Sequence, residues 1–272
     1  MAAGEDGDGT VGKALQVLDL VAEAGRPVRF AELRERSALP KATLYRLLQT
    51  LAKQGMLVFE PEGRRYSLGL RLVRFAHAAW AQSSLAPLAR PHLDALSRDA
   101  DATAHLAQLD AGHVLYLDKR NPARATVMFS EAGKIGPAWC TGVGKAMLAH
   151  LPEAEREAAL GLQALRRHTP NTLTDPDALR AELGRIRAHG VAFDDEEHEP
   201  GIVCVAAPIL GRAGALIGGV SITDTTARTS LERLAERAPR VLVCARDIAR
   251  EAADWRFPGL DEREQGMERP AT

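Results

Sequence analysis

Between residues 41 and 49 lies a group of side chains whose types suit contact with nucleic acid. Lysine and arginine can neutralise phosphates, and threonine, tyrosine and glutamine can hydrogen-bond to bases or to the sugar-phosphate backbone. Alanine is small enough to meet the methyl group of a thymine. The candidates are Lys41, Ala42, Thr43, Tyr45, Arg46 and Gln49. A solvated helix face would explain any one of them, so the elements around them decide the interpretation.

A second group of residues, further along the chain, could bind a small anion. Gly142-Val143-Gly144 opens an expected helix and lets backbone N–H groups approach a carboxylate. Ser221 and Thr223 lie two apart on an expected strand, so both hydroxyls face the same side, unless they bond to backbone within the core. Cys204 and Asp194 would complete the wall of such a site.

The three cysteines, Cys140, Cys204 and Cys244, raise a competing hypothesis. Cys140 or Cys204 could be the nucleophile of an enzyme, with His105 or His198 as the base. A catalytic cysteine needs a base within reach and a polar setting. Both cysteines lie in apolar segments and neither is tied to a histidine, so we expect no enzyme. The three also form no zinc spacing and no disulfide framework.

The acidic run over residues 194–199 is expected to be mainly a solvated loop. His198 among these carboxylates could ligate a metal, but no further well-placed ligand accompanies it. We therefore expect neither a metal nor another cofactor.

Composition and charge limit the class of protein. The chain has 272 residues, of which 46% are hydrophobic, enough for real cores in one large or two smaller domains. The net charge of −1 conceals a segment, residues 10–80, with 12 Lys and Arg against 6 Asp and Glu. A basic module facing an anion and an acidic remainder are predicted. Without a membrane-spanning run or a secretory signal, a cytoplasmic protein with no membrane contact is expected.

The elements around the first group predict a helix-turn-helix. Apolar residues repeat at helical spacing from Val11 to Ala22, and Gly25 follows as a stop. A second helix begins at residue 30, and a leucine stripe from Leu44 to Leu51 marks a third. The turn between them ends in Pro40, suited to the first helical position. We expect the helix-turn-helix over about residues 30–53.

A β-hairpin is predicted directly after this third helix. Strand-like runs flank Glu60-Pro61-Glu62-Gly63, so residues 56–68 form a wing with glycine in its turn. Arg64 and Arg65 then lie where a wing would meet phosphates or the minor groove. A helix over residues 70–83 would link this module to the next. A winged module that binds protein instead of DNA is the third hypothesis.

From residue 84 the pattern becomes a mixture of helices and antiparallel strands, typical of an α+β sensor domain. Strands are predicted over 103–109, 114–119, 126–129, 202–210 and 215–223. Helices are predicted over 85–96, 142–151 and 176–189, with one long closing helix over 231–249. The expected division is a disordered tail (1–9), a winged helix-turn-helix (10–69), a linker helix (70–83), an effector domain (84–255) and a flexible tail (256–272).

Several segments together resemble the isocitrate-lyase-regulator (IclR) family of bacterial transcription factors. They are LPKATLYRLL (39–48), YSLG (66–69), CTGVGKA (140–146), TLTD (172–175) and DDEEH (194–198), followed by Gly201 and Cys204. The resemblance covers residues 11–250 and implies a winged helix-turn-helix, a linker helix and a GAF-like effector-binding domain. It implies a ligand-responsive repressor or activator of a catabolic operon, binding double-stranded palindromic operators as homodimers that pair into homotetramers.

The resemblance also extends the expected effector site. Positions matching Met128, Gly136 and Ile202 line the apolar side of the family's pocket, whose ligands are commonly small organic acids. The expected effector-binding residues are Met128, Gly136, Gly142, Val143, Asp194, Ile202, Cys204, Ser221 and Thr223. Ala138-Trp139 departs from the family pattern, so Trp139 is expected to reshape the pocket or to stack on a ring-shaped effector. A sugar acid and an aromatic acid are both open.

Overall fold

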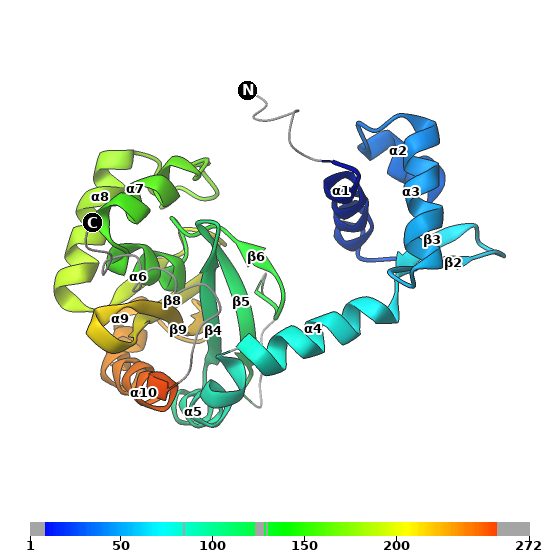
Figure 1. Ribbon diagram of the computed structural model, residues 1–272. Coiled ribbons are helices and arrows are strands. Elements are labelled where there is room, and N and C mark those ends of the chain that lie inside the picture. The colour runs from blue at the N-terminus through cyan, green and yellow to red at the C-terminus, as the bar shows by residue number, and fades with distance from the viewer. Residues whose placement is uncertain (1–8, 84, 123–127, 129, 255–272) are drawn as a thin grey trace, which may run out of the picture. The chain divides into compact units, whose positions relative to one another are not determined.

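The structure is a computed structural model that describes residues 9–83, 85–122, 128 and 130–254. The chain divides into an N-terminal unit, Met1–Gln82, and a C-terminal unit, Ser83–Thr272 (Figure 1). Each unit has a hydrophobic core of its own. The predicted tails lie outside the described residues, apart from Gly9, and so does the predicted strand at 126–129, apart from Met128.

Three helices form the core of the N-terminal unit. They are α1 (Thr10–Glu23), α2 (Phe30–Arg36) and α3 (Lys41–Lys53). The leucine stripe of α3 is fully buried, because its members recur on one face of the helix. Pro40 occupies the N-cap of α3, one position before the first helical residue expected for it. The expected apolar face of α1 is only partly covered: Val17 and Val21 are buried, whereas Val11 is 73% exposed.

A three-stranded antiparallel sheet completes this unit. Its strands are β1 (Val28–Arg29), β2 (Leu57–Glu60) and β3 (Arg65–Leu68), in the order β1-β3-β2. The short β1 was not predicted, because two residues carry no periodicity. The hairpin turn differs in detail from expectation: Arg64, not Gly63, has the left-handed backbone conformation, with φ of 50°. Helix α4 (Leu70–Ser83) follows directly.

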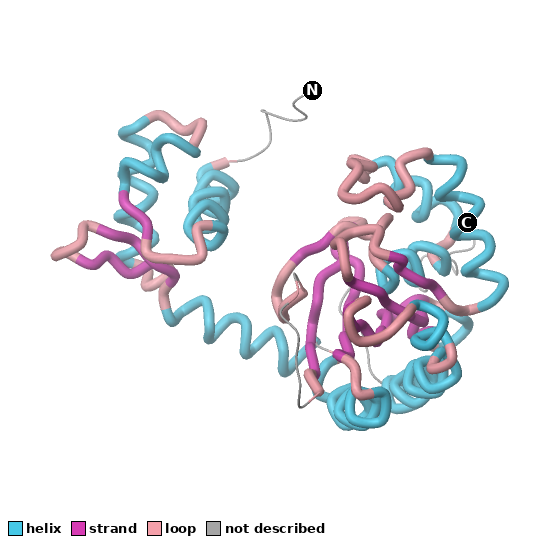
Figure 2. Tube along the Cα trace, turned by 180° about the vertical axis from the view of Figure 1, so that it is seen from behind, coloured by secondary structure: helices cyan, strands magenta, loops and turns pink. Residues whose placement is uncertain are grey.

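The C-terminal unit is built on a six-stranded antiparallel sheet in the order β6-β5-β4-β9-β8-β7 (Figure 2). Its strands are β4 (Thr103–Asp110), β5 (His113–Arg120), β6 (Ile135–Gly136), β7 (Ala192–Asp195), β8 (Ile202–Leu210) and β9 (Leu216–Thr225). The central strands are buried along almost their whole length, since helices cover both faces of the sheet.

Helices lie on the two faces of this sheet (Figure 1). One face carries α5 (Ala86–Ala100) and α10 (Ala238–Glu251), and the other carries α6 (Gly142–His150), with α7 (Glu153–Gly161) and α8 (Pro176–His189) packed against it. Helix α8 begins as predicted: Asp175 accepts a hydrogen bond from the N–H of Ala178, and Gly190 ends the helix in the left-handed conformation.

The single closing helix predicted over 231–249 is wrong. The structure has a short α9 (Leu231–Ala235) and then α10, separated by Glu236 and Arg237. Pro239 in the first turn of α10 explains the break, because proline has no N–H to continue the ladder of the preceding helix. Short 3-10 turns occur at Arg212–Gly214 and Ala252–Asp254. No helix within the described part of the chain has the length and apolar character needed to span a membrane.

Candidate functional site

Helix α3 presents the residues expected to contact DNA on the face opposite its buried leucines. Thr43 is half-buried, and the other residues of this group on α3 are exposed: Lys41, Ala42, Tyr45, Arg46 and Gln49. The amphipathic pattern therefore turns all of the group except Thr43 outward on one rigid element, and all of it except Gln49 lies in the N-terminal half of a helix that follows a short turn. That geometry is the one by which recognition helices enter the major groove.

Two of these side chains also make contacts within the unit. The ring of Tyr45 packs edge-on against Phe30 of α2, with 6.0 Å between centroids. The amide of Gln49 donates a hydrogen bond of 3.2 Å to the hydroxyl of Tyr66 on β3. These contacts tie α3 to α2 and to the hairpin. Tyr45 and Gln49 thus order the reading surface whether or not they touch bases themselves.

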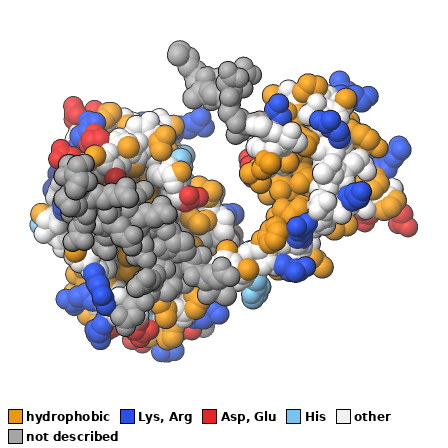
Figure 3. Space-filling view, viewed as in Figure 1, with side chains coloured by type: hydrophobic (Ala, Val, Ile, Leu, Met, Phe, Trp, Pro, Cys, Tyr) orange, Lys and Arg blue, Asp and Glu red, His pale blue; other side chains and the backbone are white. Residues whose placement is uncertain are grey.

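The hairpin extends the basic surface. Arg64 and Arg65 are both exposed, at the turn and at the start of β3. Lys and Arg side chains predominate over acidic ones on the visible face of the N-terminal unit (Figure 3). A basic helix followed by a basic hairpin can contact phosphates at two places on a duplex.

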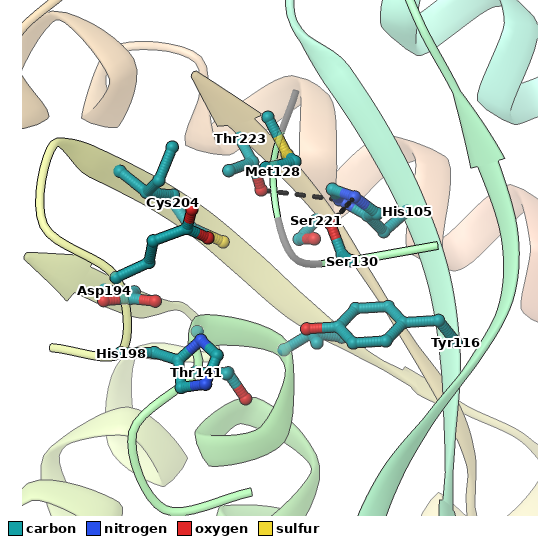
Figure 4. A pocket seen from close by; sticks show the side chains of 14 residues that line it. His105, Tyr116, Met128, Ser130, Thr141, Asp194, His198, Cys204, Ser221 and Thr223 are labelled. Carbon is teal, nitrogen blue, oxygen red and sulfur yellow. Dashed lines mark hydrogen bonds between the residues drawn. The ribbon is translucent and has the colours of Figure 1, made fainter. Parts of the chain in front are cut away.

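The C-terminal unit contains a partly open cavity of about 40 Å³, walled by the sheet, the start of α6 and the loop after β7 (Figure 4). The lining includes eight of the nine expected effector-binding residues: Met128, Gly142, Val143, Asp194, Ile202, Cys204, Ser221 and Thr223. Gly136 does not line the cavity; it is buried on β6, where it pairs with Val114 of β5. Six further residues line it that the expected site lacked: His105, Tyr116, Ser130, Thr141, His198 and Glu199.

The start of α6 forms one wall. Thr141 is the N-cap residue, yet its hydroxyl donates to the carbonyl of Pro137 at 2.7 Å instead of capping the helix. The first N–H groups of a helix have no partner within the helix, and no side-chain cap bond is present at α6 among the described residues. Gly142 is needed here, because a Cβ would lie 2.8 Å from the Sγ of Cys204.

Acidic groups border the same wall. The side chain of Asp194 is buried and accepts a hydrogen bond of 2.8 Å from the N–H of Glu197. Burial, with the nearby Glu197 as a second cause, raises the pKa of Asp194 to about 7. Asp194 can therefore hold a proton near neutral pH. The carboxylate of Glu197 forms a buried ion pair with Lys145 of α6, which fixes the loop after β7 to that helix.

Hydroxyl side chains and a histidine form the sheet side of the cavity. The Nε2 of His105 lies 2.7 Å from the hydroxyl of Ser130, and its Nδ1 lies 3.4 Å from the hydroxyl of Thr223. Burial, with Lys119 as a smaller cause, lowers the pKa of His105 to about 3, so the ring is neutral. The Nζ of Lys119 binds the carbonyl of Ser130 at 2.8 Å and holds this residue in place.

The cysteines do not have the setting of nucleophiles. Cys140, Cys204 and Cys244 are buried free thiols. Burial, with Asp194 as a second cause, raises the pKa of Cys204 to about 12 and also raises that of Cys140. Thiols held protonated are poor nucleophiles. The ring nitrogens of His105 face hydroxyls and not a thiol.

Trp139 does not line the cavity. Its indole is buried and stacks on His168, with 5.7 Å between ring centroids, and His168 in turn packs against His198 at 5.0 Å. Trp139 is therefore linked to the cavity through His168 and His198, of which His198 is a lining residue. No group of three or more potential metal-ligating side chains is gathered in the part of the chain that the structure describes.

Among the six lining residues absent from the expected site, His105 carries a sequence signal. His105 interrupts the apolar strand β4 and pairs in register with Ser221 of β9. A polar residue inside a buried strand needs a hydrogen-bond partner, so His105 could have been identified from the sequence as a candidate site residue. The others come from a different strand or from loops that carry no periodicity, so only the folded chain brings them together.

These two sites define a class of protein. A winged helix-turn-helix with an outward basic helix, joined to an α+β unit that contains a polar cavity, is a transcription regulator that binds DNA and a small molecule. Residues 10–61 match the IclR helix-turn-helix domain and residues 77–250 match the bacterial transcriptional regulator IclR C-terminal domain. The chain belongs to the IclR family of transcriptional regulators.

Individual relatives support this assignment. The HTH-type transcriptional regulator XynR of Escherichia coli is 34% identical over 226 residues, 83% of this chain and 90% of its own. An IclR-type regulator from Alicyclobacillus acidocaldarius matches with a TM-score of 0.78 and 25% identity, over 91% of this chain and 100% of its own. An IclR homolog from Microbacterium hydrocarbonoxydans, solved with 4-hydroxybenzoate, has the same fold (TM-score 0.76, 23% identity, covering 89% and 98%).

Proposed function

We propose that this regulator controls a neighbouring catabolic operon in response to a small organic acid. The carboxylate of the effector binds at the start of α6, and the effector changes the affinity for a palindromic operator. The observation that carries this proposal is the N-terminus of α6, which lacks a side-chain cap and borders a cavity lined by polar side chains. Its N–H groups and the positive end of the helix dipole favour an anion.

The effector site is tested by a thermal-shift screen of short carboxylates. A ligand that binds only the folded protein raises the Tm. At a concentration one hundred times its Kd, it adds about 2.7 kcal/mol to the free energy of unfolding. The substitution Ser221→Ala should weaken the shift, because Ser221 lines the cavity with 1% of its surface exposed. Ser97→Ala is the matched control, since Ser97 is equally buried but binds the carbonyl of Ala102, away from the cavity. Absence of any carboxylate hit would contradict the proposal.

The DNA site is tested on a duplex from the upstream region of the gene. We expect Lys41→Ala and Arg46→Ala each to weaken binding at moderate salt, because both cations are exposed on the reading face of α3. Lys53→Ala is the control: this lysine is exposed in the last turn of the same helix. Equal losses for all three variants would argue against α3 as the reading element and in favour of non-specific attraction.

A homodimer, which can pair into a tetramer, is part of the proposal. Palindromic operators require two reading helices related by a two-fold axis. The N-terminal unit offers an apolar surface for this contact: Val11 and Leu15 of α1 and Leu70 and Val73 of α4 are all at least half exposed. Hydrophobic side chains are prominent over these two helices (Figure 3). Large exposed apolar patches mark interaction sites, which is why we assign the dimer contact to these residues.

The response to effector is proposed to be a population shift. The ligand favours one arrangement of the two winged units over another, and so changes operator affinity. A difference of about 1.4 kcal/mol between the arrangements is enough for a tenfold change.

A further inference from the structure

The sheet side of the cavity carries a chain of hydrogen-bonding groups that the carboxylate site does not use. His105 links the hydroxyls of Ser130 and Thr223, and all three side chains are at least nine-tenths buried. In Figure 4 His105 and Thr223 lie on neighbouring strands with Ser130 of the loop before β6 beside them, whereas Thr141 lies on the opposite wall at the start of α6. A ligand whose carboxylate binds at the start of α6 therefore directs its other end toward His105, Ser130 and Thr223.

The chemistry of a neutral histidine between two hydroxyls limits what it can recognise. One ring nitrogen carries a proton and the other a lone pair, so one hydroxyl accepts from the ring and the other donates to it. The hydroxyl that accepts keeps its own proton for a further bond, and the hydroxyl that donates keeps its lone pairs. In either tautomer Ser130 has capacity left to donate or to accept.

Among small groups, a hydroxyl matches this capacity in both tautomers, because it both donates and accepts. A carboxylate only accepts, and a methyl group does neither. No lysine or arginine lines the cavity in the described part of the chain, so this wall offers no charge to a second anion. The hydroxyl of Tyr116 also points into the cavity, and burial raises its pKa, so it keeps its proton.

The cavity volume favours short ligands. The cavity offers about 40 Å³, roughly three times the 10–15 Å³ that one water molecule requires on the same measure. A two- to four-carbon acid therefore requires a smaller rearrangement of the walls than an aromatic ring does.

We infer that the His105–Ser130–Thr223 chain recognises a hydroxyl group of the effector, and that the effector class is a short hydroxy acid. The inference rests on the proposed function, in which the carboxylate binds at α6. These three side chains act as a specificity filter. An analogue without the hydroxyl leaves buried polar groups unpaired, so the site rejects it far more strongly than it would reject an analogue that lacks a methyl group.

Matched acids test the inference on the full-length protein by calorimetry. Glycolate, lactate, glycerate and 3-hydroxybutyrate are compared with acetate, propionate and butyrate, and 4-hydroxybenzoate is included as an aromatic acid. We expect at least one hydroxy acid to bind ten or more times as tightly as the acid of the same carbon skeleton that lacks the hydroxyl. Ser130→Ala should reduce this preference to less than threefold, while acids without a hydroxyl keep their affinity. Ser97→Ala should leave the preference unchanged.

The outcomes separate the two proposals. Binding of short acids with no preference for a hydroxyl overturns the filter and leaves the carboxylate site standing. The filter is likewise overturned, and the carboxylate site likewise stands, if the preference persists in Ser130→Ala or if 4-hydroxybenzoate binds more tightly than every short hydroxy acid. Binding of no acid at all overturns both proposals. The comparison on the unmodified protein decides the matter even if Ser130→Ala does not fold.

Discussion

At the scale of the residue, the ion pair between Lys145 and Glu197 is the most consequential contact in the C-terminal unit. Lys145 is 1% exposed and is among the largest fully buried side chains among the described residues. Burial raises the pKa of Glu197, and Lys145 opposes that shift. We expect Lys145→Met to destabilise the unit by about 3–5 kcal/mol, because it leaves an uncompensated carboxyl group in the core. Urea denaturation measures the loss.

The double substitution Lys145→Met with Glu197→Leu separates charge from packing. If the isolated carboxyl causes the loss, removing it as well should restore most of the stability. Arg180→Met is the surface comparison, because Arg180 pairs with Glu157 in the open and should contribute about 0–1 kcal/mol. A double variant as unstable as Lys145→Met alone would assign the loss to packing.

Asp194 makes a prediction about pH. Its pKa is about 7 in the folded protein against 3.8 ordinarily, so between these values the folded chain holds a proton that the unfolded chain has lost. Its contribution to stability therefore falls as pH rises from about 4 to 7, by about 1.4 kcal/mol per pH unit. The substitution Asp194→Asn removes this dependence. The Tm of the variant minus the Tm of the parent should therefore rise from about pH 4 to pH 7 and level off above pH 7. The exposed Asp195→Asn should show no such climb.

At the scale of the element, Gly69 joins the wing to α4 through a close approach. A Cβ at this position would lie 2.9 Å from the carbonyl carbon of Gly55 and closer still to its oxygen. Backbone cannot move aside as a side chain can, so we expect Gly69→Ala to destabilise the N-terminal unit by about 1–3 kcal/mol. Calorimetry should show its transition at a lower temperature, with the C-terminal transition unmoved. Gly161→Ala, where a Cβ meets nothing within 4 Å, is the control.

Elements with strong periodicity could be predicted from sequence, and short or interrupted ones could not. The leucine stripe of α3 and the apolar run of β8 repeat often enough to fix type and position. Strands β1, β6 and β7 have two to four residues, and the last two residues of β7 belong to the acidic run expected to be a loop. The break before α10 depends on Pro239, whose effect the apolar periodicity across it concealed.

The same limit applies to the candidate site: residues that a sequence pattern marks could be predicted, and residues that only the tertiary fold brings together could not. Residues that a motif or a period of two marks, such as Gly142 and Ser221, were expected and line the cavity. Ser130, His198 and Tyr116 reach it from separate loops and strands, and their placement is a property of the tertiary fold. The expected Gly136 does not line the cavity; it lies on β6, the edge strand of the sheet.

At the scale of the whole molecule, the near-zero net charge conceals a basic segment that we expect to bind DNA. Residues 10–80 carry 12 Lys and Arg against 6 Asp and Glu, although the full chain has a net charge of −1. Binding should therefore weaken steeply with salt, and each phosphate contact adds about 0.9 to the log–log slope. Replacing Arg64 or Arg65 with Gln should reduce the slope by about 1, whereas Arg166→Gln on the other unit should not. An unchanged slope in both wing variants would remove the wing from the interface.

Assembly is the last property argued at this scale. A charged side chain introduced among the exposed apolar residues of α1 or α4 cannot be buried at an interface without a partner. We therefore expect Val11→Glu and Leu70→Glu to shift the protein toward monomer in sedimentation velocity and to weaken operator binding, since one reading helix then binds alone. Leu162→Glu is the control, because Leu162 is 60% exposed after α7 in the other unit. If both variants keep the parent's mass, dimerisation depends on another surface, and their operator affinity should then be unchanged as well.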